Sequence, residues 1–181
     1  MPAVLAVLDA VTDTVTAQTA KIITGTAPGG DAESPVALDT LRGVVQIVGN
    51  EPVTSVLLVP RDSATAPVVL RGDALSVVRQ ANGLDVMVQG QRTAERDVAS
   101  SPGGVPVFVV AAFTVRAADG VAAVDGTLEQ RGPGYALRLA NDSVCVIGTL
   151  PLALRDAVGA RVYLVGSLNA PSSWGVLRRR E

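Results

Sequence analysis

The sequence predicts a mostly β protein that contains two copies of one small module, preceded by a helical segment. Three observations predict this fold class. Short runs rich in Val, a β-branched residue that suits strands, recur along the chain. Eighteen Gly and eleven Pro separate these runs. Glycines also recur at the same intervals in two stretches of the chain. Hydrophobic residues make up 48% of the 181 residues, which is enough apolar material for a core.

The glycine intervals are the signature of an internal repeat. An interval of 11 residues separates Gly72 from Gly83 and Gly148 from Gly159, and 7 further residues lead to Gly90 and Gly166. An interval of 6 residues upstream separates Gly43 from Gly49 and Gly126 from Gly132. The apolar phase agrees as well, because Val68 with Leu70 aligns on Val144 with Val146. Such a repeat indicates one supersecondary unit used twice.

The first copy is expected to contain five strands, near residues 41–48, 54–60, 67–71, 84–91 and 106–116. A helical piece from Asp73 to Asn82 separates the third strand from the fourth. Asp73 is its predicted N-cap, and Gly83 is its predicted left-handed stop. An extra loop is expected from Thr93 to Pro106.

The second copy repeats this order in a more compact form. Its strands are expected near 122–130, 135–140, 143–147, 161–167 and 173–178. The helix is predicted over Leu150 to Val158, with Gly159 as its stop. Asn141 and Asp142 suit a two-residue hairpin turn between the second and third of these strands.

A helix placed after the third of five strands resembles the OB-fold, a small Greek-key barrel. The resemblance covers about residues 40–178. It implies an all-β protein with short helices, made of two tandem five-stranded OB-like barrels and an N-terminal helical segment. The implied domains are residues 1–37, 38–118 and 119–181. OB-folds bind single-stranded nucleic acid, oligosaccharides or proteins, so the resemblance implies a fold and leaves the function open.

The N-terminal residues stand outside the repeat. Apolar residues at helical spacing predict an amphipathic helix over about residues 4–15. These apolar residues are Val4, Leu5, Leu8, Val11 and Val15. The stretch Thr26–Pro35 has the composition of a linker. This helix could cap a barrel or dock on a partner, and the sequence leaves both open.

Strand alternation predicts the core of the first copy. The expected core residues are Val45, Ile47, Leu57, Val69, Val86, Val88, Val107 and Val109. Burial along the strand 84–91 should show a period of two.

The residues that commonly carry catalysis are scarce in this chain. It has no His, which excludes Ser-His-Asp and Cys-His arrangements, and Cys145 is the single Cys, which excludes an ordinary zinc site. Asp and Glu are scattered, and Gly25–Gly30 lacks the Lys-Ser/Thr ending of a P-loop. We therefore expect no catalytic residues, no bound metal, no cofactor and no enzymatic activity.

Charge and aromatic content favour a protein partner. The formal net charge is −2, so no global field attracts nucleic acid. We expect a non-catalytic binding or scaffold module, an accessory or structural subunit that contacts another protein. The alternatives are a single-stranded nucleic-acid binder and a binder of small ligands or saccharides. The candidate interaction residues are Phe108, Tyr135, Tyr163 and Trp174.

The sequence also bears on location. No run of about 20 apolar residues predicts a transmembrane helix. The N-terminus lacks the positive region of a signal peptide, which favours a cytoplasmic protein, and the alternative is an extracytoplasmic protein trimmed from a precursor. The bias toward Arg over Lys is typical of a skewed, bacterial-like composition. No pattern indicates an oligomeric state.

Overall fold

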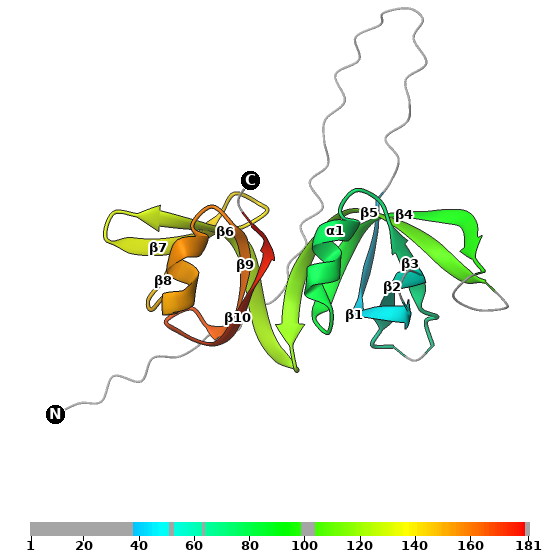
Figure 1. The fold of residues 1–181 in the computed structure, drawn as a ribbon, viewed down its shortest axis with the longest axis horizontal. Helices are drawn as coiled ribbons and strands as arrows, with labels where there is room; N and C mark the ends of the chain where they lie inside the picture. The colour runs from blue at the N-terminus through cyan, green and yellow to red at the C-terminus, as the bar shows by residue number, and fades with distance from the viewer. Residues whose placement is uncertain (1–37, 51–52, 63, 99–103, 180–181) are drawn as a thin grey trace, which may run out of the picture. The chain divides into compact units, whose positions relative to one another are not determined.

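The computed structural model describes residues 38–50, 53–62, 64–98 and 104–179 (Figure 1). Residues 36–181 form one compact unit, and its described residues are mostly β, with ten strands in one sheet and one short α-helix. The helix expected over residues 4–15 and the linker that follows it lie outside the described residues. None of the helices in the described ranges has the length and apolar character needed to cross a membrane.

The first half, residues 38–118, contains five strands close to their predicted positions. Their bounds are β1 Asp39–Asn50, β2 Val53–Pro60, β3 Val68–Arg71, β4 Asp85–Asp97 and β5 Val105–Ala118. β1 pairs with β2 and β4, β2 with β3, and β4 with β5, all antiparallel. β3 and β5 pair in parallel. Each of these strands therefore has a neighbour on both edges.

The second half, residues 119–179, contains the other five described strands. Their bounds are β6 Val121–Arg131, β7 Gly134–Arg138, β8 Val144–Ile147, β9 Arg161–Ser167 and β10 Ala170–Arg178. β6 pairs with β7 and β9, β7 with β8, and β9 with β10, all antiparallel. A hairpin from β5 to β6 joins the halves through the pairs Ala117–Ala122 and Ala118–Val121. The four antiparallel pairings of the first half thus recur in the second.

Backbone hydrogen bonds confirm the repeat at the glycine that ends each helical piece. Gly83 N–H donates to the Val45 carbonyl, and Gly159 N–H donates to the Leu128 carbonyl, both at 2.8 Å. These glycines have φ values of 83° and 87°, which a residue with a Cβ adopts at a cost. The predicted left-handed stops are therefore confirmed in both halves.

The helical pieces are shorter than predicted. The first consists of α1 (Leu75–Val78) and a 3₁₀ turn, η1 (Arg79–Ala81), and the second is the 3₁₀ helix η2 (Leu152–Ala157). Asp73 is not the N-cap: Ala74 holds that position, without a side-chain cap. The Leu75 N–H instead donates to the Gly72 carbonyl at 3.1 Å, so the backbone satisfies this donor.

Most of the described residues in the loop predicted from Thr93 to Pro106 belong to strands. β4 continues to Asp97 and β5 begins at Val105, so the two strands form a long hairpin. An ion pair of 2.5 Å joins Asp97 to Arg71 on β3. This contact holds the hairpin against β3, and no local sequence pattern predicts it.

The predicted core is correct for five of its eight residues. Val45, Val69, Val86, Val88 and Val107 are buried. Burial along β4 alternates from Val86 to Gln91 as predicted, but the predicted period of two fails at the start of the strand, where Leu84, Asp85 and Val86 are all buried. The prediction for Leu57 is wrong by one residue. Val45 pairs with Leu58, and Leu58 and Val56 are the buried residues of β2.

Two further core predictions are wrong. Ile47 is 40% exposed and lies beside the exposed Asn82, which accepts a hydrogen bond from its N–H. Val109 is 39% exposed, because Phe108 and Val110 on either side of it take the inward positions.

The halves share one of two core clusters. Val162 and Leu164 on β9 pack into the second cluster, with Leu128 and Leu137. Val165 on the same strand packs into the first cluster, as do Ala123 and Leu177 from neighbouring strands. β9 is thus buried on both faces, which is why residues 36–181 form one unit.

Candidate functional site

A buried carboxylate links the two halves. Asp125 on β6 accepts hydrogen bonds from the Val115 N–H of β5 at 2.7 Å and from Arg161 Nε of β9 at 2.8 Å. The Asp125 side chain is 4% exposed. Arg161 also donates to the Phe113 carbonyl, and its guanidinium carbon lies 4.2 Å from the centre of the Phe113 ring. This cluster orders three strands around one charge pair.

The first half carries the same pair with its charges exchanged. Asp85 on β4 accepts from Arg42 on β1 at 3.0–3.1 Å, and Arg61 lies 2.8 Å from it. The register Gly43–Val86 matches Gly126–Val162, so Arg42 corresponds to Asp125. The hydrogen bond to Asp85 raises the pKa of Arg42 above its ordinary value. Both halves bury the acid and leave the base partly exposed.

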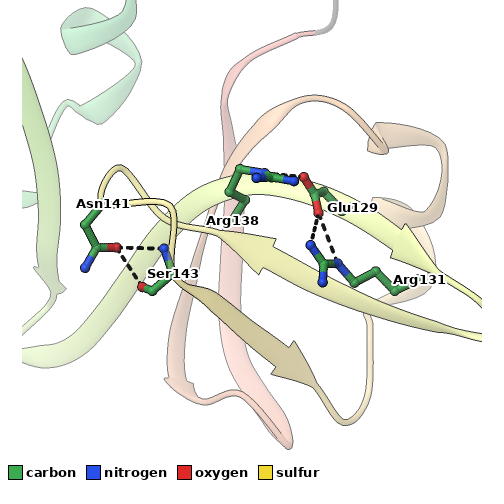
Figure 2. Close-up of polar contacts among 5 residues, drawn as sticks. All are labelled: Glu129, Arg131, Arg138, Asn141 and Ser143. Carbon is green, nitrogen blue, oxygen red and sulfur yellow. Dashed lines mark hydrogen bonds and ion pairs between the residues drawn. The ribbon is translucent and has the colours of Figure 1, made fainter.

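An open groove with a volume of about 550 Å³ lies beside Asp125 and Arg161. Its walls come from α1, β5, β6, β7, β9 and β10, and they carry Ser76, Thr127 and Arg138. Figure 2 shows that Arg138 is engaged by Glu129, with 2.5 Å between Arg138 Nε and Glu129 Oε1. Two of the groove's arginines are therefore committed to carboxylates, which weakens its attraction for an anionic ligand.

Glu129 is the centre of a second charge cluster, drawn in Figure 2. Arg138 and Arg131 both donate to its carboxylate, Arg131 at 3.0 and 3.2 Å. The hydrogen bond from Arg138, followed by that from Arg131, lowers the pKa of Glu129 below its ordinary value. In the turn that follows β7, Asn141 Oδ1 accepts from the Ser143 N–H and hydroxyl. Leu139 N–H donates to the Ser143 carbonyl, so this turn has three residues instead of the predicted two.

The structure does not bring the candidate aromatic residues together at one surface. Phe108 is fully buried, so it is not available as a surface contact. Phe113 on the same strand is also buried. In a regular strand, Phe108 and Phe113 would point to opposite faces, because an odd number of positions separates them. Gln89 pairs with Ala112 while Gly90 pairs with Val110, which makes Ala111 an extra residue in β5. This bulge shifts the phase of the strand and turns both rings inward.

The remaining three candidates differ in their surroundings. Tyr163 packs against the first core cluster, and Tyr135 packs against the second. The ring of Tyr163 also covers Gly175 on β10. Trp174 is 38% exposed and is the most accessible of the four predicted contact residues.

The outer edge of β8 is a feature that sequence reasoning missed. Among the described strands, β8 pairs with β7 alone. Val144 and Val146 on this strand are 36% and 74% exposed. The strand is free of charged residues. An edge of this kind presents unpaired N–H and C=O groups and can pair with another strand.

The counterpart of β8 in the first half is covered. Pairing equates Leu58 with Leu137, and therefore Val69 with Val146. Val69 is fully buried and pairs with Val107 of β5. The alignment of Val68 and Leu70 on Val144 and Val146 is accordingly wrong by one residue. Val69 is therefore buried in the first half, whereas the corresponding Val146 is exposed in the second.

A short hairpin explains the difference. Gly90 pairs with Val110 in the first half and Gly166 with Pro171 in the second, so the position of Val107 falls on Leu168. Leu168 lies between β9 and β10, where its carbonyl accepts a hydrogen bond from the Gly148 N–H. The second half thus turns back where the first half extends to cover β3.

No family model, no curated protein and no solved structure matches this chain.

A sequence signal for this edge exists in hindsight. Only four residues separate Gly166 from Pro171, whereas the corresponding glycine and its partner in the first half enclose the long hairpin from Gln91 to Val109. The length of this connection decides whether the third strand of each half is paired.

Among the described residues, no group of three or more His, Cys, Asp or Glu side chains could hold a metal ion.

Proposed function

We propose that this chain is a non-catalytic protein-binding module made of two OB-like barrels, and that it receives an extended strand of its partner on β8. The observation that carries the proposal is the unpaired edge of β8, where Val146 is 74% exposed. Strand addition provides affinity through main-chain hydrogen bonds and specificity through alternate side chains.

The barrel assignment is supported by the pairings of the first half. The order β1–β2–β3–β5–β4 returns to β1, which is a closed circuit with one parallel pair. The helical piece lies between the third and fourth strands, as in an OB-fold. The second half repeats the circuit except for the pairing of β8 with β10, so it corresponds to the same barrel left open.

The chemistry of the surfaces supports a binding role. Asp125, Arg161, Glu129 and Arg138 are all engaged with each other or with backbone groups. Such ion pairs stabilise the strands that carry them. None of these four residues is a nucleophile beside a general base. Arginines that are already paired also provide little for a nucleic-acid backbone, which needs free cationic side chains.

Charge placed on the edge tests the proposal. Affinity capture from the cells that express the chain should retain partner proteins with the natural sequence and lose them with Val146→Lys, because a charged edge resists strand addition. Val98→Lys is the matched control, since Val98 is also 74% exposed but lies directly after β4 in the first half. If the three baits retain the same proteins, β8 is not the binding site and the proposal fails.

A further inference from the structure

The direction of the free backbone groups on β8 can be derived. Leu139 N–H donates to the Ser143 carbonyl at 2.9 Å. Hydrogen-bonded pairs alternate along an antiparallel ladder, so the next such pair is Leu137 with Cys145, which the register places opposite each other. The N–H and C=O groups of Val144 and Val146 therefore face away from β7. Four backbone groups point outward from this short strand.

This pattern is complementary to itself. If two copies of β8 meet antiparallel with Cys145 opposite Cys145, Val144 of each copy lies opposite Val146 of the other. Both pairs are then hydrogen-bonded pairs, so all four outward groups of each copy find partners. Centring the contact on Val146 instead would oppose Val144 to Gly148, whose N–H already donates to Leu168.

We infer that the strand received by β8 is β8 of a second copy of this chain, in a two-fold symmetric dimer whose axis passes between the two Cys145 residues. The inference rests on the proposed use of the β8 edge and names its occupant. The same surface serves both subunits, as a two-fold interface requires. Each exposed valine gains a valine from the other copy, and such cross-strand β-branched pairs stabilise sheets. The strand carries no charge that would repel its copy.

Covalent trapping gives a direct test, because Cys145 is the single cysteine of the chain. Directly opposed residues of a non-hydrogen-bonded pair have Cα atoms about 4.5 Å apart, within the range of a disulfide. Diamide oxidation of the full chain should give a covalent dimer: the S–H bonds of two thiols break, an S–S bond forms, and diamide takes up the two electrons and two protons. Mass spectrometry should assign its disulfide to Cys145 and Cys145.

The association should also be measured without the disulfide. A short edge contact predicts a weak dimer, with a Kd in the micromolar range or above. Sedimentation equilibrium of Cys145→Ser should show a dimer that forms with rising concentration. Val146→Lys should weaken it at least tenfold, and Val98→Lys should leave it unchanged. Val146→Pro should also abolish it while preserving the fold, because the lost N–H points away from β7.

Several outcomes would overturn the inference. A full chain that stays monomeric to about 1 mM, or a dimer that Val146→Lys does not weaken, would exclude this interface. A dimer that Val146→Lys weakens but that never gives the Cys145 disulfide would exclude this register. A monomeric chain whose captured partners are still lost with Val146→Lys would exclude the second copy as occupant and leave the proposed function standing.

Discussion

Asp125 illustrates how one buried side chain can set the geometry of several strands. Its carboxylate serves the Val115 N–H and Arg161 together, so it fixes the end of β5 against β6 and β9. The opposite charge arrangement at Arg42 and Asp85 shows that the cross-strand pair is common to both halves. The hydrogen bond that Asp125 accepts from the backbone N–H of Val115 ties it to a third strand, whereas the third partner of Asp85 is the side chain of Arg61.

Removal of this carboxylate should be costly. Asp125→Ala leaves the Val115 N–H without its acceptor and deprives the partly buried Arg161 of its charged partner. We expect a loss of about 2–4 kcal/mol in the free energy of unfolding. Urea denaturation measures this loss. Asp125→Asn should lose less, because its amide oxygen still accepts from Val115.

Two controls define the origin of the effect. Asp39→Asn removes a surface pair with Arg92 and should change stability by about 0.5 kcal/mol or less. The charge exchange Asp125→Arg with Arg161→Asp should not restore stability, because Arg cannot accept the Val115 hydrogen bond. Full recovery by the exchange would show that the ion pair alone matters.

Glu129 should titrate below its ordinary pKa, because Arg138 and then Arg131 stabilise its charged form. A lowered pKa in the folded state contributes stability above the pKa of the unfolded chain. That contribution disappears as the pH falls through the folded value. NMR titration of the Glu129 carboxyl carbon measures the shift directly.

Variants of the two arginines separate their contributions. Arg138→Gln should return the pKa of Glu129 further toward its ordinary value than Arg131→Gln, because the Arg138 hydrogen bond has the largest effect. Equal shifts in the two variants would contradict the dominant effect of the Arg138 hydrogen bond, which is 2.5 Å long against 3.0 and 3.2 Å for those of Arg131. The difference in stability between the natural chain and Glu129→Gln should vanish in acid.

At the scale of secondary-structure elements, corresponding glycines should respond alike in the two halves. Gly83→Ala and Gly159→Ala force a Cβ into left-handed backbone and should each cost about 1 kcal/mol. Gly43→Ala and Gly126→Ala should cost more, because a Cβ there would lie 2.4 Å from the Val59 carbonyl oxygen and 2.5 Å from that of Arg138.

Chemical denaturation of the four variants gives this ranking. The repeat predicts that each pair agrees within the spread of context effects and that the order of the pairs is the same in both halves. A large cost at Gly43 beside a negligible cost at Gly126 would show that corresponding strands do not approach one another in the same way.

Elements also show how the length of one hairpin changes the use of a surface. β3 is covered because β4 and β5 extend past Gly90 and are held to it by Arg71 and Asp97. β8 occupies the position in the second half that β3 occupies in the first, but only two residues connect β9 to β10. Its edge is consequently open, and this opening is the basis of the proposed binding site.

At the scale of the whole molecule, the two halves should unfold together. β9 contributes Val162 to one cluster and Val165 to the other, so neither cluster is complete without this strand. Far-ultraviolet circular dichroism reports all strands, and the fluorescence of Trp174, the single tryptophan, reports the second half. The two urea transitions should coincide in the natural chain.

A cavity at the shared core should reduce this coupling. Val165→Ala should lower stability by about 2 kcal/mol, because Val165 is 3% exposed and its lost methyl groups leave a cavity. We expect the two transitions to move apart in this variant. Leu137→Ala, within the second cluster alone, should lower stability without separating them. Distinct transitions in the natural chain would show that the halves are energetically independent.

The sequence by itself determined the approximate positions of the strands, except for the extension of β4 to Asp97. Val-rich runs between Gly and Pro placed all ten strands, and glycine spacing revealed the repeat, because local conformational preferences act through neighbouring residues. The positive-φ glycines that end both helical pieces followed for the same reason. The absence of His and of a second Cys is equally readable in the sequence, and it excludes Ser-His-Asp and Cys-His arrangements within the chain.

The tertiary structure decided which of those strands have neighbours and which side chains reach the surface. A single extra residue, Ala111, turned Phe113 inward, and a one-residue difference in register separated Val146 from its expected counterpart. Both effects arise because strand side chains alternate, so one inserted residue exchanges inside for outside. Whether β8 is covered depends on how far a distant hairpin extends, and that is a property of chain segments brought together by folding.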